Sequence, residues 1–181
     1  MMEIACISHK ETVKAQDILA DFLKSFAAVT KYGRTVIYEG DIYYIPYYML
    51  TYRVEETGES YGFLAGMLCE DISVFRLDGD TGIEIDKKTV DETCVLRGEK
   101  TEEEVREEVA RKIKLNKRLR KMFRRFHMEE ISIQPLYLAE QTFYVKGKST
   151  FLFLVDSFLR KVDFKHLGEV KKRFVENCMA G

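Results

Sequence analysis

Apolar residues recur at steps of three and four positions in three stretches of the chain, which is the period of an amphipathic helix. The stretches cover about residues 11–29, 101–126 and 164–177. Thr101 followed by Glu104 is typical of a capping box, in which the two side chains bind the free amides at a helix start. Gly33, after the first stretch, suits a left-handed helix cap. The pattern therefore predicts three helices.

The segments between these helices are rich in tyrosine, isoleucine and valine, which favour strands. Turns are predicted at Gly40-Asp41, Thr57–Ser60, Asp78–Gly82 and Gly147. The expected strands cover residues 2–7, 34–39, 42–54, 61–69, 73–77, 83–85, 131–145 and 150–155. We expect an α+β fold in which one or two antiparallel sheets pack against amphipathic helices. Because the sequence has no long linker or low-complexity tract, we expect a single compact domain over residues 1–181.

The two prolines of the chain, Pro46 and Pro135, anchor a weak internal repeat. In both copies the proline lies twelve residues before a turn glycine, which is Gly58 or Gly147. The same ungapped alignment pairs Ile42 with Ile131, Tyr48 with Tyr137 and Ser60 with Ser149. It predicts two helix–hairpin units, pseudo-repeat 1 at about 10–86 and pseudo-repeat 2 at about 101–178. Chance similarity in a β-rich chain is the alternative explanation.

The strand expected at 131–145 has two unequal faces, because successive side chains of a strand point to opposite sides. One face carries Ile131, Ile133, Pro135, Tyr137, Ala139 and Phe143. The other carries Ser132, Gln134, Glu140 and Thr142, interrupted by Leu136 and Leu138. We therefore expect a half-buried strand with the first face in the core and the second towards solvent.

The overall composition restricts the class of protein. A net charge of -1 means that anion binding requires a local basic patch. Four scattered cysteines in a chain of this length favour a reduced protein and a cytoplasmic location. The first residues lack the pattern of a secretory signal. The longest nearly apolar run, residues 61–69, is shorter than the roughly 18–20 residues of a membrane-spanning helix, so no transmembrane segment is expected.

The second predicted helix ends in a strongly basic segment. Residues 111–125 contain nine Lys or Arg residues and no acidic residue. At 100° per residue, one arc of this helix carries six of them, opposite an apolar side. They are Lys114, Lys117, Arg118, Lys121, Arg124 and Arg125. This arc predicts contact with nucleic-acid phosphates or another anionic partner. The alternative is a solvated face whose charges are paired with Asp and Glu elsewhere.

A cluster of tyrosines occupies the strand expected at 42–54. Tyr44, Tyr48 and Tyr52 share one face of this strand. Tyrosines combine rigid apolar area with a polar tip, so they are common at protein interfaces and in ligand clefts. The alternative is ordinary packing of the sheet, with the hydroxyls reaching its rim.

Recognisable catalytic and metal-binding motifs are absent from the sequence. The Asp78–Asp86 segment lacks the glycine and glutamate spacing of a calcium loop, and a β-turn is the better interpretation. His9, His127 and His166 share no metal-ligand spacing, so each is expected to be a surface or packed histidine. We therefore expect neither a cofactor nor a metal. A site that the fold assembles, such as Cys94 with His127, is left open.

The leading interpretation is a non-catalytic binding or interaction protein that uses the tyrosine face, which we define as Tyr44, Tyr48 and Tyr52. Its partner would be another protein or a second copy of the chain, because unpaired sheet edges invite association. The first alternative is a protein that binds nucleic acid or an anionic partner through the basic helix 111–125. The second alternative is an enzyme with a fold-assembled site.

Overall fold

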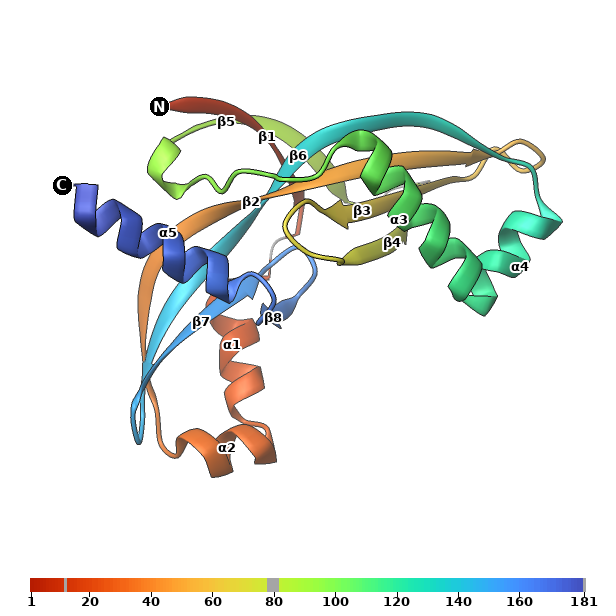
Figure 1. Ribbon diagram of the computed structural model, residues 1–181. Helices are drawn as coiled ribbons and strands as arrows, with labels where there is room; N and C mark the ends of the chain where they lie inside the picture. The colour runs from red at the N-terminus through yellow and green to blue at the C-terminus, as the bar shows by residue number, and fades with distance from the viewer. Residues whose placement is uncertain (12, 78–81, 181) are drawn as a thin grey trace. The chain divides into compact units, whose positions relative to one another are not determined.

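The computed structural model describes residues 1–11, 13–77 and 82–180. Its elements in chain order are β1 (Met2–His9), α1 (Ala15–Leu23), α2 (Phe26–Tyr32), β2 (Val36–Val54), β3 (Ser60–Gly66), β4 (Ile72–Arg76), β5 (Ile83–Val90), the 3-10 helix η1 (Glu92–Cys94), α3 (Glu102–Leu115), α4 (Lys117–Arg125), β6 (Met128–Lys146), β7 (Thr150–Asp156), β8 (Lys161–Asp163) and α5 (Leu167–Ala180). The protein is therefore of the mixed α+β class, as predicted (Figure 1).

The described strands form one largely antiparallel sheet. They hydrogen-bond in the order β4-β3-β2-β6-β1-β5, while β7 pairs with β6 and β8 pairs with β7. The β2–β3, β3–β4, β6–β7 and β7–β8 pairs are antiparallel, and the β1–β6 pair is parallel. Among the described residues, no helix is both long and apolar enough to cross a membrane.

Contacts within the chain divide it into two compact units, each built from separate segments. The first unit comprises Met1–Ile45, Glu84–Leu96 and Tyr137–Gly181, and the second comprises Pro46–Ile83 and Arg97–Leu136. The long strands β2 and β6 each contribute residues to both units. Because the segments alternate along the chain, neither unit coincides with a predicted repeat. A single domain over 1–181 stays a prediction.

In the first unit, α1 and α2 cover the β6–β7 hairpin. Leu19 and Leu23 lie one helical turn apart on α1, and both are buried against Phe143 and Phe153 of the hairpin. The predicted helix at 11–29 is in fact two helices, because Ser25 caps a new start by accepting a hydrogen bond from the amide of Ala28 (3.3 Å). Gly33 is the C-cap of α2 and has a positive φ of 75°, but its ψ of -149° lies outside the left-handed helical conformation that was predicted.

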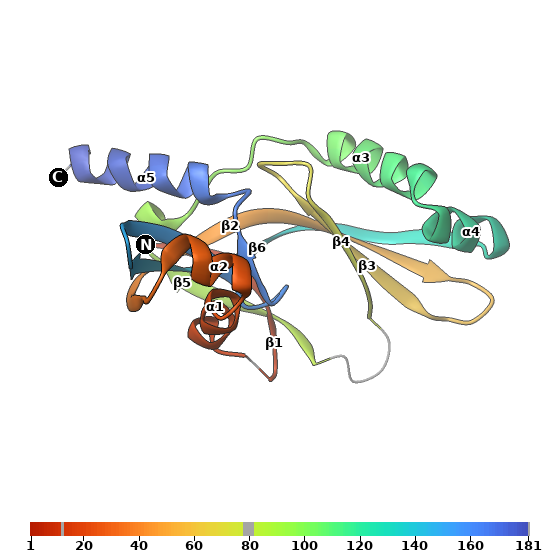
Figure 2. The same ribbon diagram turned by 90° about the horizontal axis from the view of Figure 1, so that it is seen from below.

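In the second unit, α3 packs on the meander formed by β2, β3 and β4. Its buried residues Val105 and Val109, again one turn apart, contact Leu50 of β2 and Phe63 and Ala65 of β3. Figure 2 shows α3 and α4 following one another along one side of β3 and β4. The apolar stripe predicted for the second helix is thus the side of α3 that packs on the sheet.

That second helix, expected to run unbroken over 101–126, is interrupted at Asn116. This residue is the C-cap of α3 and the N-cap of α4. Its side-chain oxygen accepts hydrogen bonds from the amides of Arg118 (3.0 Å) and Leu119 (3.1 Å). Asparagine competes for backbone amides in this way and favours helix starts over helix interiors. The expectation of one continuous helix is therefore wrong at this position.

The proline-anchored repeat is not confirmed. Each proline lies within a strand of 19 residues, but Pro46 is the eleventh residue of β2 and Pro135 is the eighth residue of β6. The residues paired by the ungapped alignment therefore occupy different positions in their strands. The turn predicted at Gly40-Asp41 is also wrong, since both residues lie inside β2. The predicted turn at Asp78–Gly82 falls almost entirely on positions 78–81, outside the described residues.

The buried face of β6 differs from the predicted one. Leu136, Leu138, Glu140 and Thr142 are buried, whereas Ile131 is 51% exposed. Between Leu136 and Thr142 every second residue is buried, but on the face opposite to the predicted one, whereas Phe143 is buried as predicted. The consequence is that the carboxylate of Glu140, expected towards solvent, lies inside the first unit.

Candidate functional site

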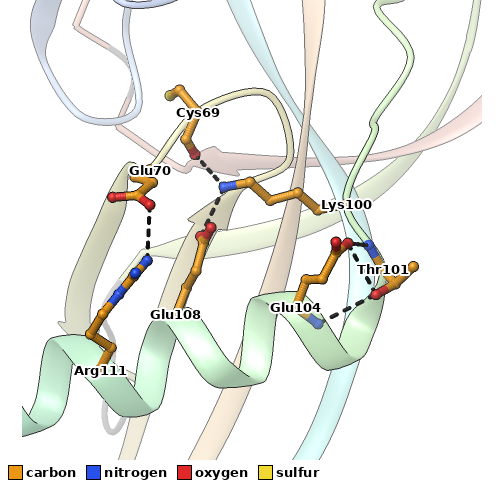
Figure 3. Close-up of polar contacts among 7 residues, drawn as sticks. All are labelled: Cys69, Glu70, Lys100, Thr101, Glu104, Glu108 and Arg111. Atoms are coloured by element: carbon orange, nitrogen blue, oxygen red, sulfur yellow. Dashed lines mark hydrogen bonds and ion pairs between the residues drawn. The ribbon is translucent and has the colours of Figure 1, made fainter.

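A polar network fastens α3 to the turn between β3 and β4 (Figure 3). Lys100, just before the helix, donates hydrogen bonds from Nζ to the carbonyl oxygen of Cys69 and to Oε2 of Glu108, both at 2.8 Å. One turn beyond Glu108, Arg111 forms an ion pair with Glu70 across 2.9 Å. The contacts of Lys100 and Arg111 therefore attach α3 to the same turn near the start and near the end of the helix.

The start of α3 is the predicted capping box. The side-chain oxygen of Thr101 accepts a hydrogen bond from the amide of Glu104 (3.3 Å), and the carboxylate of Glu104 accepts one from the amide of Thr101 (2.8 Å). The bond from the Thr101 amide stabilises the charged carboxylate and lowers the pKa of Glu104. Acidic residues at this end complement the helix dipole. The acidic residues thus lie at the start of α3, and the basic residues lie towards its end and in α4.

The predicted basic residues lie on both sides of the break at Asn116 and are all exposed to solvent. We call them the basic surface: Lys114, Lys117, Arg118, Lys121, Arg124 and Arg125. Within the described part of the chain, none of the six forms an ion pair with an acidic residue. The neighbouring Arg111 differs, because Glu70 pairs with it. The alternative of a face neutralised by neighbouring carboxylates is therefore not what the described residues show.

Aromatic packing holds the opposite side of α4 on the sheet. The ring of Phe123 makes edge-on contacts with Tyr52 (5.4 Å between centroids) and Phe63 (6.1 Å). Leu119, one turn earlier, packs against the same cluster. An amphipathic helix bound by its apolar side must present its polar side to water. This packing explains why the basic surface is exposed.

The residues of the tyrosine face pack against the hydrophobic clusters of the two units. Tyr48 and Tyr52 are half-buried against the cluster of the second unit, and Tyr44 is half-buried against Cys6 and Val95 in the first unit. The hydroxyl of Tyr52 donates a hydrogen bond to Oε2 of Glu130 (3.4 Å), and burial raises the pKa of Tyr52 to about 12. Packing of this kind accounts for much of their apolar area. A role in binding stays a prediction.

A buried cluster of ionisable residues was missed by the sequence reasoning. It consists of Glu140 on β6, Asp163 at the end of β8, and His166 just before α5, and each side chain is at most 2% exposed. Nδ1 of His166 lies 2.9 Å from Oδ2 of Asp163 and 3.5 Å from Oε1 of Glu140. Asp156, opposite Glu140 in the β6–β7 pair, is buried beside them.

Burial and charge shift the pKa values in this cluster in different directions. Burial raises the pKa of Glu140 to about 7 and that of Asp156 to about 6. Burial also acts upwards on Asp163, but the hydrogen bond with His166 and the backbone amides around it bring the pKa of Asp163 down to about 2. One carboxylate is therefore strongly stabilised in its charged form, and the other two are not.

The sequence contains one signal for this cluster, the Asp163-x-x-His166 spacing ahead of a helix. Oδ1 of Asp163 accepts hydrogen bonds from the amides of Lys165 (2.6 Å) and His166 (3.1 Å), which is the geometry of a helix-start turn. This turn aims the His166 ring inward. The prediction left open whether His166 is packed or exposed, and it overlooked the two carboxylates that the fold places beside the buried ring.

The open suggestion of a Cys94–His127 pair receives no support from the contacts of either residue. Cys94 lies in the first unit, with Sγ 3.9 Å from Oγ1 of Thr93. His127 lies in the second unit, where its amide donates to the carboxylate of Glu56 (2.9 Å).

Comparison with known protein families, curated proteins and solved structures found no match to this chain.

Proposed function

We propose that this chain is a non-catalytic binding protein. Its basic surface on α3 and α4 would bind the phosphate backbone of a nucleic acid. The observation that supports this is the exposure of six cationic side chains without an acidic partner in the described ranges. Surface charges that a protein neutralises internally contribute little to binding, whereas unpaired ones attract phosphates over a Debye length.

Phosphate contacts of this kind are strongly dependent on salt and weakly dependent on sequence. Each neutralised phosphate of duplex DNA adds about -0.9 to the slope of log affinity against log salt. Six contacts would lower the affinity by about three orders of magnitude between 50 and 200 mM salt. Because contacts to phosphate carry no direct sequence information, we expect similar affinities for unrelated sequences of equal length.

The test compares two triple variants with the same change of net charge. The test variant carries Lys114→Gln, Lys117→Gln and Lys121→Gln in the basic surface. The control carries Lys146→Gln, Lys171→Gln and Lys172→Gln, which replace three exposed lysines of the first unit. Binding of a fluorescently labelled duplex is measured by anisotropy at 50 mM salt. We expect the test variant to bind at least about tenfold more weakly than the control, which should resemble the unmodified protein.

Two results would contradict the proposal. Equal loss in both variants would mean that net charge, and not the basic surface, determines the attraction. Absence of binding by the unmodified protein at low salt would reject a nucleic-acid partner altogether. In that case an acidic protein would be the remaining partner for the same surface, since complementary charges also steer protein association.

We further propose an internal duplication, a homodimer and a cytoplasmic location. An internal duplication fits the recurrence of two helices, a 19-residue strand, a hairpin partner and a short third strand in α1–β4 and again in α3–β8. A homodimer fits the sheet edges, and light scattering of the purified chain tests it. A cytoplasmic location fits four cysteines that are all in the free thiol form.

A further inference from the structure

The carboxylate of Glu140 is buried without the hydrogen bonds that such a group requires. Its side chain is fully buried, and neither of its oxygens accepts a hydrogen bond from any described residue. The nearest ring nitrogen, Nδ1 of His166, is 3.5 Å away, which is longer than a hydrogen bond. A buried acceptor without a donor costs free energy, more so when it is charged. An unpartnered group of this kind points to a ligand that completes its coordination.

Glu140, Asp163 and His166 present three ligand atoms of the kind that divalent transition metals prefer. The three atoms all lie within 4.8 Å of one another, with separations of 2.9 Å and 3.5 Å from Nδ1 to the two carboxylates. Zinc binds imidazole nitrogen and carboxylate oxygen at about 2.1 Å, so two ligands of a tetrahedral ion are about 3.4 Å apart. Shifts of a few tenths of an ångström would therefore fit the ion.

Charge also favours a cation in this position. Three carboxylates, those of Glu140, Asp156 and Asp163, lie buried in the same cluster with a single imidazole. Lys161, opposite Asp156 in the β7–β8 pair, offsets part of this charge. A divalent ion would compensate the remainder, because buried charges are normally paired or coordinate metals.

We propose that Glu140, Asp163 and His166 form a buried binding site for a divalent transition metal ion, of which zinc fits the ligand set best. The imidazole ligand argues against magnesium and calcium, because these ions prefer oxygen ligands. Burial of all three ligands leaves little space for the water molecules of an octahedral ion. Oδ2 of Asp156, which is buried nearby, also accepts no hydrogen bond from the described residues.

The site has the character of a structural metal centre. Its ligands come from β6, from the end of β8 and from the start of α5, so the ion would join three segments that are distant in sequence. The proton held between Nδ1 of His166 and Asp163 leaves when the metal binds, since metal ligation requires the deprotonated nitrogen. Because all three ligands are buried, the ion would be shielded from bulk solvent, which favours a structural role over a catalytic one.

The experiment uses the full chain, freed of any affinity tag and stripped with a chelator. Zinc is titrated into it at pH 7.5, and the bound metal is measured by calorimetry and elemental analysis. The test variant is Glu140→Gln, which keeps the shape of the protonated acid and is expected to fold. The control is Glu169→Gln, an exposed acidic residue in the first turn of α5, three positions after His166.

We expect one zinc ion per chain in the unmodified protein and in the Glu169→Gln variant. The Glu140→Gln variant should bind at least about 100-fold more weakly, because loss of even an outer-shell partner costs 10–100-fold. Zinc at about 100 times its dissociation constant should raise the melting temperature of the unmodified protein by roughly 5–10 °C. The Glu140→Gln variant should show no such increase.

Several results would overturn the proposal. These are the absence of zinc binding at micromolar concentration, and binding that survives unchanged in the Glu140→Gln variant. Should this variant fail to fold, the site is tested by adding cobalt to the unmodified protein and recording the visible absorption spectrum. The visible spectrum of tetrahedral cobalt supports the site, and the spectrum of the hydrated ion contradicts it. A purely structural hydrogen-bond cluster would show neither the spectrum nor the thermal shift.

Discussion

The two ion pairs that fasten α3 to the β3–β4 turn should differ greatly in their contribution to stability. In the Lys100–Glu108 pair the side chains are 18% and 14% exposed, and Nζ also binds the carbonyl of Cys69. In the Arg111–Glu70 pair they are 56% and 73% exposed, although the N–O distances are nearly equal. Exposed pairs contribute about 0–1 kcal/mol because water and salt screen them. Removing one partner of a less exposed pair leaves the other charge without compensation, which destabilises the fold more strongly.

We therefore expect Lys100→Met to lower the free energy of unfolding by about 2–3 kcal/mol, since two charge-assisted hydrogen bonds are lost. The Lys100→Met/Glu108→Gln double variant should be less destabilised than the sum of its singles, by about 1–2 kcal/mol. For Arg111→Met with Glu70→Gln, the same coupling should be below about 0.5 kcal/mol. Urea unfolding monitored by circular dichroism measures these differences, with about 2 kcal/mol moving the midpoint by about 1 M.

Equal coupling energies for the two pairs would refute the reasoning, because burial is the feature that distinguishes them. A Lys100→Met effect below about 0.5 kcal/mol would likewise mean that the apolar contacts of α3 hold it on the sheet without help from the polar network.

Three further predictions follow from particular residues. Asn116→Ala should destabilise the protein by about 1 kcal/mol and speed amide exchange in α4, whereas Asn116→Ser should retain the cap. An unchanged exchange rate would argue against the cap. Gly33→Ala should cost about 1–3 kcal/mol in urea unfolding, because its φ of 75° and ψ of -149° suit glycine almost exclusively; a neutral effect would contradict this backbone conformation. Tyr52, with a pKa raised by burial to about 12, should keep its proton while exposed tyrosines ionise. The unfolded chain releases that proton near pH 10, so stability should fall as the pH rises from about 10 to 12. Difference titration of the Tyr52→Phe variant by ultraviolet absorption measures this, and loss of a transition near pH 10 would oppose the assignment.

The features of the fold that the sequence predicted are local ones. The capping box of Thr101 and Glu104 and the end of α2 at Gly33 involve residues a few positions apart, so their chemistry is visible in the sequence. The sequence also placed the six residues of the basic surface on the arc opposite an apolar stripe, but it left open whether their charges are free or neutralised by acidic residues.

The features that were missed depend on contacts between distant segments. Both faces of β6 carry apolar residues, so alternation alone could not decide which face is buried. Its buried Glu140 is explained by Asp163 and His166, more than twenty positions later, and by Asp156 on the paired strand. The break at Asn116 was missed because the flanking residues all tolerate a helix, and a side-chain cap there competes with helix continuation.

The most direct test of the proposed function is the salt dependence of duplex binding by the unmodified protein. A logarithmic plot of affinity against salt concentration between 50 and 200 mM should have a slope of about -5, as expected for contacts from the six residues of the basic surface. The Lys114→Gln/Lys117→Gln/Lys121→Gln variant should reduce that slope to about half. A slope near zero, or one unchanged in this variant, would mean that the basic surface does not bind phosphates.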